Sequence, residues 1–290
     1  MSNGIGTRQN EVKSIAMLAA QCQLYNEVGD LDGLSIILLV VLPLAFAIMQ
    51  EVGTPWSWIR FLSYGLSLSM LLISIFLSKA SREKKSTAAS IQLAFDTYVF
   101  AMPWDTRLFG KKRNLNAEIA GKSKKILDDE KERAALKDWY TPIVDQIPLK
   151  KGIFACQKEN YHWDGGLRKR YRGAAILLIA VLASVIFIIG IVKNEPFQEL
   201  ITRIVFILPM VRWLVNTING LNEDLDRLKE LDEEFKQDSN RSMSELQMIQ
   251  KRITEHRKAA VKIPNAVYNI FKNNDEDREH RIVTMDVEQQ

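Results

Sequence analysis

The stretch Gly173–Val192, GAAILLIAVLASVIFIIGIV, decides the fold of this chain of 290 residues. It holds 20 residues without a charge, and Ser184 is its only polar side chain. A helix of that length spans about 30 Å, the thickness of a bilayer's hydrocarbon core. The basic run Arg168–Arg172 stands directly before it, as is typical of the cytosolic end of a membrane span. We therefore predict a transmembrane helix here, in preference to the buried core helix of a soluble protein.

Three further apolar stretches complete a set of four predicted spans. Leu34–Met49 is short and contains Pro43, and Phe61–Leu77 follows it after a connection with two tryptophans that suit the membrane interface. Phe197–Ile218 carries two arginines and a proline, and it is accepted because the chain must return across the membrane after Val192. The four spans then form two hairpins.

The distribution of charge sets the predicted orientation. Residues 78–172 hold 21 Lys and Arg against 12 Asp and Glu, whereas the short connections Gln50–Trp58 and Lys193–Pro196 together hold one Lys and two Glu. The positive-inside rule places residues 78–172 in the cytosol. With four spans, both termini are then cytosolic as well. The polar N-terminal residues resemble no signal peptide, so the first apolar block is expected to stay in the mature protein.

The predicted class is an all-α membrane protein with five parts. These are an N-terminal cytosolic amphipathic helix (1–32), a first transmembrane hairpin (33–79), a cytosolic helical domain (80–172), a second transmembrane hairpin (173–218), and C-terminal cytosolic helices with a tail (219–290). Aromatic side chains around Phe95–Trp104 and Trp139–Trp163 are interpreted as the core of the cytosolic domain, or else as surfaces that stack on a planar ligand. After the fourth span two apolar stripes, separated near Asp238–Asn240, predict either a helical hairpin or one long helix.

Short motifs in a fixed order resemble a bacterial family of four-transmembrane effectors linked to second-messenger nucleotide synthases in phage defence, the S-4TM family. The matching pieces cover almost the whole chain: Arg8-Gln9-Asn10, Leu18-Ala19-Ala20-Gln21, Leu24-Tyr25, Phe95-Asp96, Met102-Pro103-Trp104-Asp105, Trp139-Tyr140, Pro148-Leu149, Cys156-Gln157, Trp163-Asp164, Leu167-Arg168-Lys169-Arg170-Tyr171, and Ile263-Pro264 with Tyr268. Asp105 departs from the family pattern, which has Asn there.

The resemblance implies an effector of the bacterial inner membrane that responds to a cyclic oligonucleotide made on infection. Its opening as a pore would breach the membrane and arrest or kill the cell. A homo-oligomer in the lipid bilayer is expected on the same ground, with no DNA or RNA partner.

A pore needs polar residues on one face of a span. In the second span Arg60, Ser63, Ser67, Ser74, Ser78 and Ser81 fall within about 60° of one another at about 100° per residue. The stripe predicts either a pore lining or tight helix packing, because Ser lets two backbones approach closely. In the fourth span Arg212 and Asn216 share a face, and they predict a pore lining unless Arg212 extends towards the cytosolic headgroups.

A cyclic nucleotide offers phosphates to Arg and flat bases to aromatic rings. The candidate ligand-binding residues are Trp163, Asp164, Arg168, Arg170 and Tyr171, next to the third span, together with Trp104. The alternative is that the basic residues among them bind anionic lipid headgroups.

Motifs for catalysis and metal binding are absent from the sequence. It has no phosphate-binding P-loop, no HExxH and no nucleophile elbow, and its two cysteines, Cys22 and Cys156, do not stand at metal-ligand spacing. We therefore expect neither an enzyme nor a cofactor or metal site. The competing function is a membrane sensor or scaffold without a pore, which recruits partners through its cytosolic helices.

Overall fold

Every regular element of the described chain is a helix, which confirms the predicted all-α class. The computed structural model describes residues 2–45, 57–194, 196–236, 240–264, 267 and 284–285. The helices in order are α1 (Ile5–Gln9), α2 (Val12–Ile36), the π-helical η1 (Ile37–Val41), α4 (Ser57–Val99), α5 (Thr106–Phe109), α6 (Asn116–Asp128), α7 (Glu130–Ala134), the 3₁₀-helical η2 (Pro142–Gln146), α8 (Leu149–Val192), α9 (Phe197–Phe235) and α10 (Met243–Ala259).

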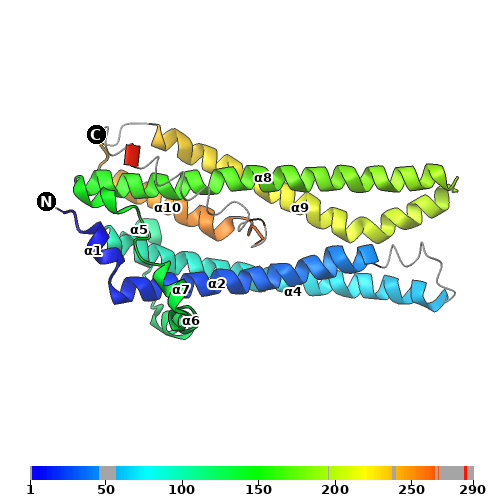
Figure 1. Cartoon of the computed structure of the whole chain (residues 1–290), viewed down its shortest axis with the longest axis horizontal. Coiled ribbons are helices and arrows are strands. Elements are labelled where there is room, and N and C mark those ends of the chain that lie inside the picture. The colour runs from blue at the N-terminus through cyan, green and yellow to red at the C-terminus, as the bar shows by residue number, and fades with distance from the viewer. Residues whose placement is uncertain are drawn as a thin grey trace.

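Four long helices form two antiparallel pairs. Figure 1 shows α2 beside α4 in one layer and α8 beside α9 in the other, and both pairs are in extensive contact. The shorter α10 lies between the two layers at one end of the molecule, where it contacts α4, α8 and α9. It begins at a capping box, in which Ser242 and Glu245 each bond the other's backbone N–H. One end of the molecule is therefore a bundle of helices around α10, and the other end consists of the two helix pairs.

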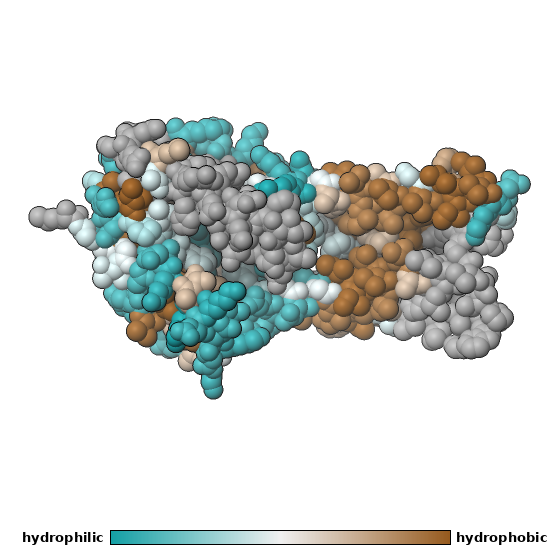
Figure 2. All heavy atoms as spheres, viewed as in Figure 1, coloured by the Kyte–Doolittle hydropathy of each residue, from teal (hydrophilic) through white to brown (hydrophobic). Residues whose placement is uncertain are grey.

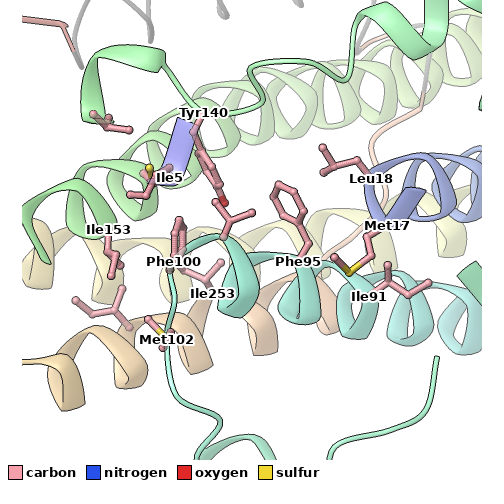
Figure 3. Close-up of a cluster of buried hydrophobic side chains, with 14 of the residues drawn as sticks. Ile5, Met17, Leu18, Ile91, Phe95, Phe100, Met102, Tyr140, Ile153 and Ile253 are labelled. Carbon is pink, nitrogen blue, oxygen red and sulfur yellow. The ribbon is translucent and has the colours of Figure 1, made fainter. Parts of the chain in front are cut away.

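The bundle end contains the main hydrophobic core (Figure 3). Phe95 of α4 and Phe100, the residue directly after that helix, flank Tyr140, and the rings of Phe100 and Tyr140 have centroids 5.3 Å apart. Leu18 of α2 and Ile253 of α10 bring two more helices to the same cluster. For these aromatic residues the interpretation as a domain core is confirmed.

The opposite end is apolar on its outer surface (Figure 2). Large side chains there are open to the surroundings, and Val192 at the end of α8 is 77 % exposed. Two helices of the described chain, Val12–Ala45 and Leu149–Val192, are long and apolar enough to cross a membrane. The spans predicted within α4 and α9 stay predictions.

The N-terminal helix and the first predicted span form one helix rather than two elements. It runs from Val12 to Ala45 and widens into the π-helical turn Ile37–Val41 directly before Pro43. A proline ring collides with the carbonyl of the residue four positions earlier, here Leu39. A wider turn at that point relieves the collision and lets the helix continue. The connection 46–56, with its predicted interfacial tryptophan at position 56, lies outside the described residues.

The alternatives for the C-terminal helices are also decided. The fourth predicted span and the first apolar stripe are parts of the single helix α9, which ends at Phe235. The second stripe is the separate helix α10, and its apolar face, with Leu246, Ile249 and Ile253, is buried in the core. The tail predicted from Asn273 onward falls almost wholly outside the described residues.

Candidate functional site

A buried ionic cluster lies where the bundle meets the apolar helices. Arg168 of α8 is 6 % exposed, and its Nε donates to Asp164 Oδ2 at 2.7 Å. Its Nη1 donates both to Asp224 of α9 and to the carbonyl oxygen of Val261, the latter at 2.9 Å. Asp224 is fully buried and also accepts from the backbone N–H of Val261 at 2.8 Å. One guanidinium thus connects α8, α9 and the segment that follows α10.

His256 of α10 extends this cluster, since its Nε2 lies 2.6 Å from Asp164 Oδ2. Burial by itself would raise the pKa of Asp164. The positive charge of Arg168 and the bond to His256 outweigh burial and hold that pKa well below its usual range. Asp164 therefore stays ionised at neutral pH, and the cluster persists as a set of charge-assisted bonds.

A second buried polar cluster is centred on Asp96 of α4, which is fully buried. The Tyr140 hydroxyl donates to its Oδ1 at 2.6 Å, and Gln250 Nε2 and Arg257 Nη1 donate to its Oδ2 at 2.8 and 2.6 Å. The backbone of Tyr140 is in turn paired with both amide atoms of Gln9, at 2.8 and 3.1 Å. Burial, and then the charge of Asp96, raise the pKa of Tyr140 well above its ordinary value, so its hydroxyl remains a donor.

A third group of polar and charged side chains joins α2 to α4 close to the buried ionic cluster. Ser81 of α4 is buried and hydrogen-bonds Asp32 of α2, and burial raises the pKa of Asp32. Burial also lowers the pKa of the neighbouring Lys85, whose Nζ donates to the carbonyl oxygen of Ala260 at 2.9 Å. The junction therefore ties every long helix to α10 or to the residues that follow it. Because these bonds join the helices to one another, a displacement in the bundle would be passed to the apolar helices.

Comparison with protein families adds an identity to this arrangement. Residues 3–284 match the family described as the SMODS-associating 4TM effector domain. The chain belongs to this family. The description and the two apolar helices indicate a membrane effector in signalling and defence. Searches of curated proteins and of solved structures find no match.

Two of the predicted ligand-binding residues of this 4TM effector, Asp164 and Arg168, are brought together in the buried ionic cluster. Tyr171 lies beside them, 9 % exposed, and packs with Leu167, Leu221 and Ile263. Arg170 is on the exposed side of α8, and the side chain of Trp163 lies outside the described part of the chain.

Trp104 is not part of this group. Its ring packs on Phe109 at 5.3 Å and its Nε1 donates to the carbonyl oxygen of Gly110 at 2.9 Å. The adjacent Pro103 accepts a bond from Gln247 of α10. His256 lies nine residues further along α10, which is about 13 Å at 1.5 Å per residue. The departure from the family at Asp105 has a simple account, because Asp105 caps the N-terminus of α5 and Asn caps a helix equally well.

The predicted pore-lining residues fall into three groups. Arg212 and Asn216 are exposed on α9, in the apolar half. In the serine stripe Ser78 is exposed and Ser74 is half-buried, while Ser81 at its end packs against α2. The side chains of Arg60, Ser63 and Ser67 lie outside the described residues. Among the described residues of the stripe, Ser81 therefore serves helix packing.

Sequence reasoning missed Asp224, Asp96 and Arg257. A signal was present for the two carboxylates, since each stands on the apolar face of an otherwise amphipathic helix. Asp224 lies between Leu221 and Leu228, and Asp96 follows Phe95. A charge at such a position is nearly always paired when the helix is buried.

Proposed function

We propose that this chain is a pore-forming membrane effector of bacterial anti-phage defence that a cyclic oligonucleotide opens. Opening breaches the inner membrane and arrests or kills the cell. The effector is a homo-oligomer without catalytic activity, and the nucleotide is its only small-molecule ligand. Residues 34–49, 61–77, 173–192 and 197–218 cross the membrane in this proposal, and both termini are cytosolic.

One observation carries the proposal. Helices α8 and α9 each run without a break from the buried ionic cluster into the apolar half of the molecule. A helix is stiff over such lengths, so a shift or rotation at the cluster is passed to the apolar segment of the same helix. Regulated membrane proteins use rigid-body motions of this kind. The ionic cluster is therefore the place where ligand binding would act on the spans.

The ligand's phosphates would compete for Arg168. A phosphate accepts the same paired N–H donors as a carboxylate. A nucleotide bound at Arg168 would replace Asp224 and weaken the link between α8 and α9. Tyr171, three residues after Arg168 on α8, would supply a ring, whereas Arg170 lies on the exposed side of that helix.

The exposed polar residues of α9 support a pore in an oligomer. Arg212 and Asn216 lie open on a helix whose neighbouring exposed residues include Leu208 and Val215. In a bilayer, a charged side chain in that position is stabilised by water or by another protein surface. A ring of copies with this face of α9 turned inward would provide both.

The scaffold alternative requires a recruiting surface on the cytosolic helices. The apolar face of α10 is already used inside the chain, since Leu246, Ile249 and Ile253 are each less than 5 % exposed. Partners could therefore reach that face only after α10 leaves the core. The burial of this face weighs against recruitment through α10.

The decisive experiment is dye release from liposomes of phosphatidylethanolamine and phosphatidylglycerol that carry the purified protein. Cyclic di-AMP, cyclic di-GMP, cyclic UMP–AMP and cyclic triadenylate are added separately, and the matching linear nucleotides serve as controls. Release with one cyclic nucleotide and not with its linear form supports a gated pore. Binding of a nucleotide to folded, inserted protein without release would contradict the pore and leave the scaffold.

A further inference from the structure

The residues that follow α10 cross the junction between the bundle and the spans. We call Ala260–Pro264 the strap. The chain leaves the helix at Ala260 with an extended backbone (φ −52°, ψ 140°). Ala260 and Ile263 are 7 % and 6 % exposed and the other three residues are half-buried, so the strap packs closely against the helices.

The strap's backbone is bonded by side chains from three different long helices. Lys85 of α4 donates to the carbonyl oxygen of Ala260, and Arg168 of α8 donates to that of Val261, each at 2.9 Å. Asp224 of α9 accepts from the N–H of Val261 at 2.8 Å. All three side chains are less than 10 % exposed. Breaking a hydrogen bond between a buried charged group and the backbone costs free energy, because the charge is left without a partner. The three helices therefore stay together at this point while the strap keeps its bonds.

The strap's side chains contact α2, the remaining long helix, and add to the contacts with α8 and α9. Lys262 interacts with the charge of Asp32 on α2, and its Nζ lies 5.7 Å from the centre of the Tyr25 ring. Ile263 packs in a small cluster with Leu167, Tyr171 and Leu221. Each long helix is therefore contacted by the strap within a few residues of the cytosolic end of its predicted span.

A close approach to α9 depends on one glycine. A Cβ placed on Gly220 would come within 2.6 Å of Val261 Cγ2, closer than side-chain carbons approach one another. Gly220 therefore allows the strap to lie directly against the backbone of α9. A larger residue at position 220 would therefore displace the strap without altering any charged group.

We propose that the strap is an autoinhibitory clasp, which holds the cytosolic ends of the four spans together and must leave its seat before the pore opens. This inference rests on the proposed pore function and adds the element that keeps the pore closed. It follows from the geometry, because a single short segment is hydrogen-bonded to three of the long helices that an opening would have to move apart, and Lys262 contacts the fourth, α2. A nucleotide that takes Arg168 would remove one of the strap's bonds.

The test uses Gly220→Ala, which inserts a methyl group under Val261. We expect dye release from liposomes without any nucleotide to rise about tenfold, since overpacking by a methyl group typically shifts such an equilibrium by at least that factor. Hydrogen exchange at the Val261 amide should rise with it. In the Val261→Ala background, where the colliding methyl groups are removed, Gly220→Ala should have little effect on either quantity. Gly173→Ala is the matched control, because no atom lies within 4 Å of its added Cβ.

A locked variant tests the same inference in the opposite direction. Gly220→Cys with Val261→Cys should form a disulfide on oxidation, and the oxidised protein should release no dye with any of the four cyclic nucleotides. Reduction should restore the response of the unlocked double variant. A locked protein that still opens would overturn the clasp.

The outcomes separate the clasp from the pore. If amide exchange rises in Gly220→Ala without dye release, while the wild type releases dye with a nucleotide, the strap is a structural element only. Unchanged exchange also contradicts the inference. If the wild type releases dye with none of the nucleotides and the variant with a loosened strap is equally silent, the pore itself is contradicted.

Discussion

The two ends of this molecule are stabilised in different ways. At the bundle end, apolar side chains are buried together with paired charges such as Asp96–Arg257 and Arg168–Asp224. At the apolar end, the outward faces of α8 and α9 are exposed over most of their length, and the buried cluster there is small. The bundle thus carries its own tertiary structure, whereas the apolar helices depend on what surrounds them. A protein built in this way can rearrange its apolar end while its bundle end stays folded.

The largest effect is expected from breaking the ionic cluster. Asp224→Ala leaves the guanidinium of Arg168 buried with one carboxylate fewer and removes the acceptor of the Val261 N–H. We expect a loss of about 3 kcal/mol in unfolding free energy, the lower end of the usual cost of breaking a buried pair, because Arg168 keeps its bond to Asp164. Thermal unfolding in nanodiscs measures it. The neighbouring Glu223 is the control, since its side chain is 72 % exposed and Glu223→Ala should cost less than about 0.5 kcal/mol. Equal losses for the two variants would show that the bundle end does not depend on its buried charges.

A pair of tyrosines sharpens the contrast within the bundle. The hydroxyls of Tyr140 and Tyr98 each donate to a carboxylate at 2.6 Å, but Tyr140 is 1 % exposed and Tyr98 is half-buried. Tyr140→Phe should cost about 1.5–3 kcal/mol, because it removes a bond to a buried charge. Tyr98→Phe should cost under about 1 kcal/mol, since water can replace the lost hydroxyl as the hydrogen-bond donor to Glu11. Denaturant unfolding of both variants measures the difference, and similar losses would contradict a role for burial.

A pH dependence follows from Glu27, which bonds Lys84 and, at 2.6 Å, Lys122. Burial acts to raise the pKa of Glu27, but the two lysine bonds outweigh it and lower that pKa from 4.5 to about 2. A lowered folded-state pKa stabilises the fold fully above the unfolded value and loses that contribution as the pH falls towards the folded value. Glu27→Gln should therefore lower the melting temperature at pH 7, and its difference from the wild type should shrink as the pH falls from about 4.5 towards 2. A difference that stays constant over that range would show that the two lysines contribute nothing through the charge of Glu27.

The sequence predicted well what depends on long-range composition and poorly what depends on individual pairs. The uncharged length of Gly173–Val192 and the apolar stripe of α10 predicted helices that the structure contains. The pairing of Arg168 was not predictable, because its partner Asp224 lies 56 residues away and its place on an apolar face indicates burial without naming the partner. Only the packing of α8 on α9 brings the two together. The continuity of α9 from its predicted span into the first apolar stripe was one of the alternatives that the sequence left open, since composition changes there and backbone geometry does not.

The smallest effect on stability is expected at the apolar end, where it separates stability from function. Arg212 is exposed, so Arg212→Gln should change the unfolding free energy by less than about 0.5 kcal/mol. Under the proposed function it should nevertheless change ion flux, since a fixed charge beside a pore attracts anions and repels cations. Single-channel recording in planar bilayers measures this as a shift of the reversal potential towards cations. Lys193→Gln, which removes an exposed charge beyond the end of α8, is the control and should leave ion selectivity unchanged. If Arg212→Gln instead destabilises the protein as strongly as a bundle variant, then Arg212 is a packing residue, and the apolar end is more self-contained than its exposed surface indicates.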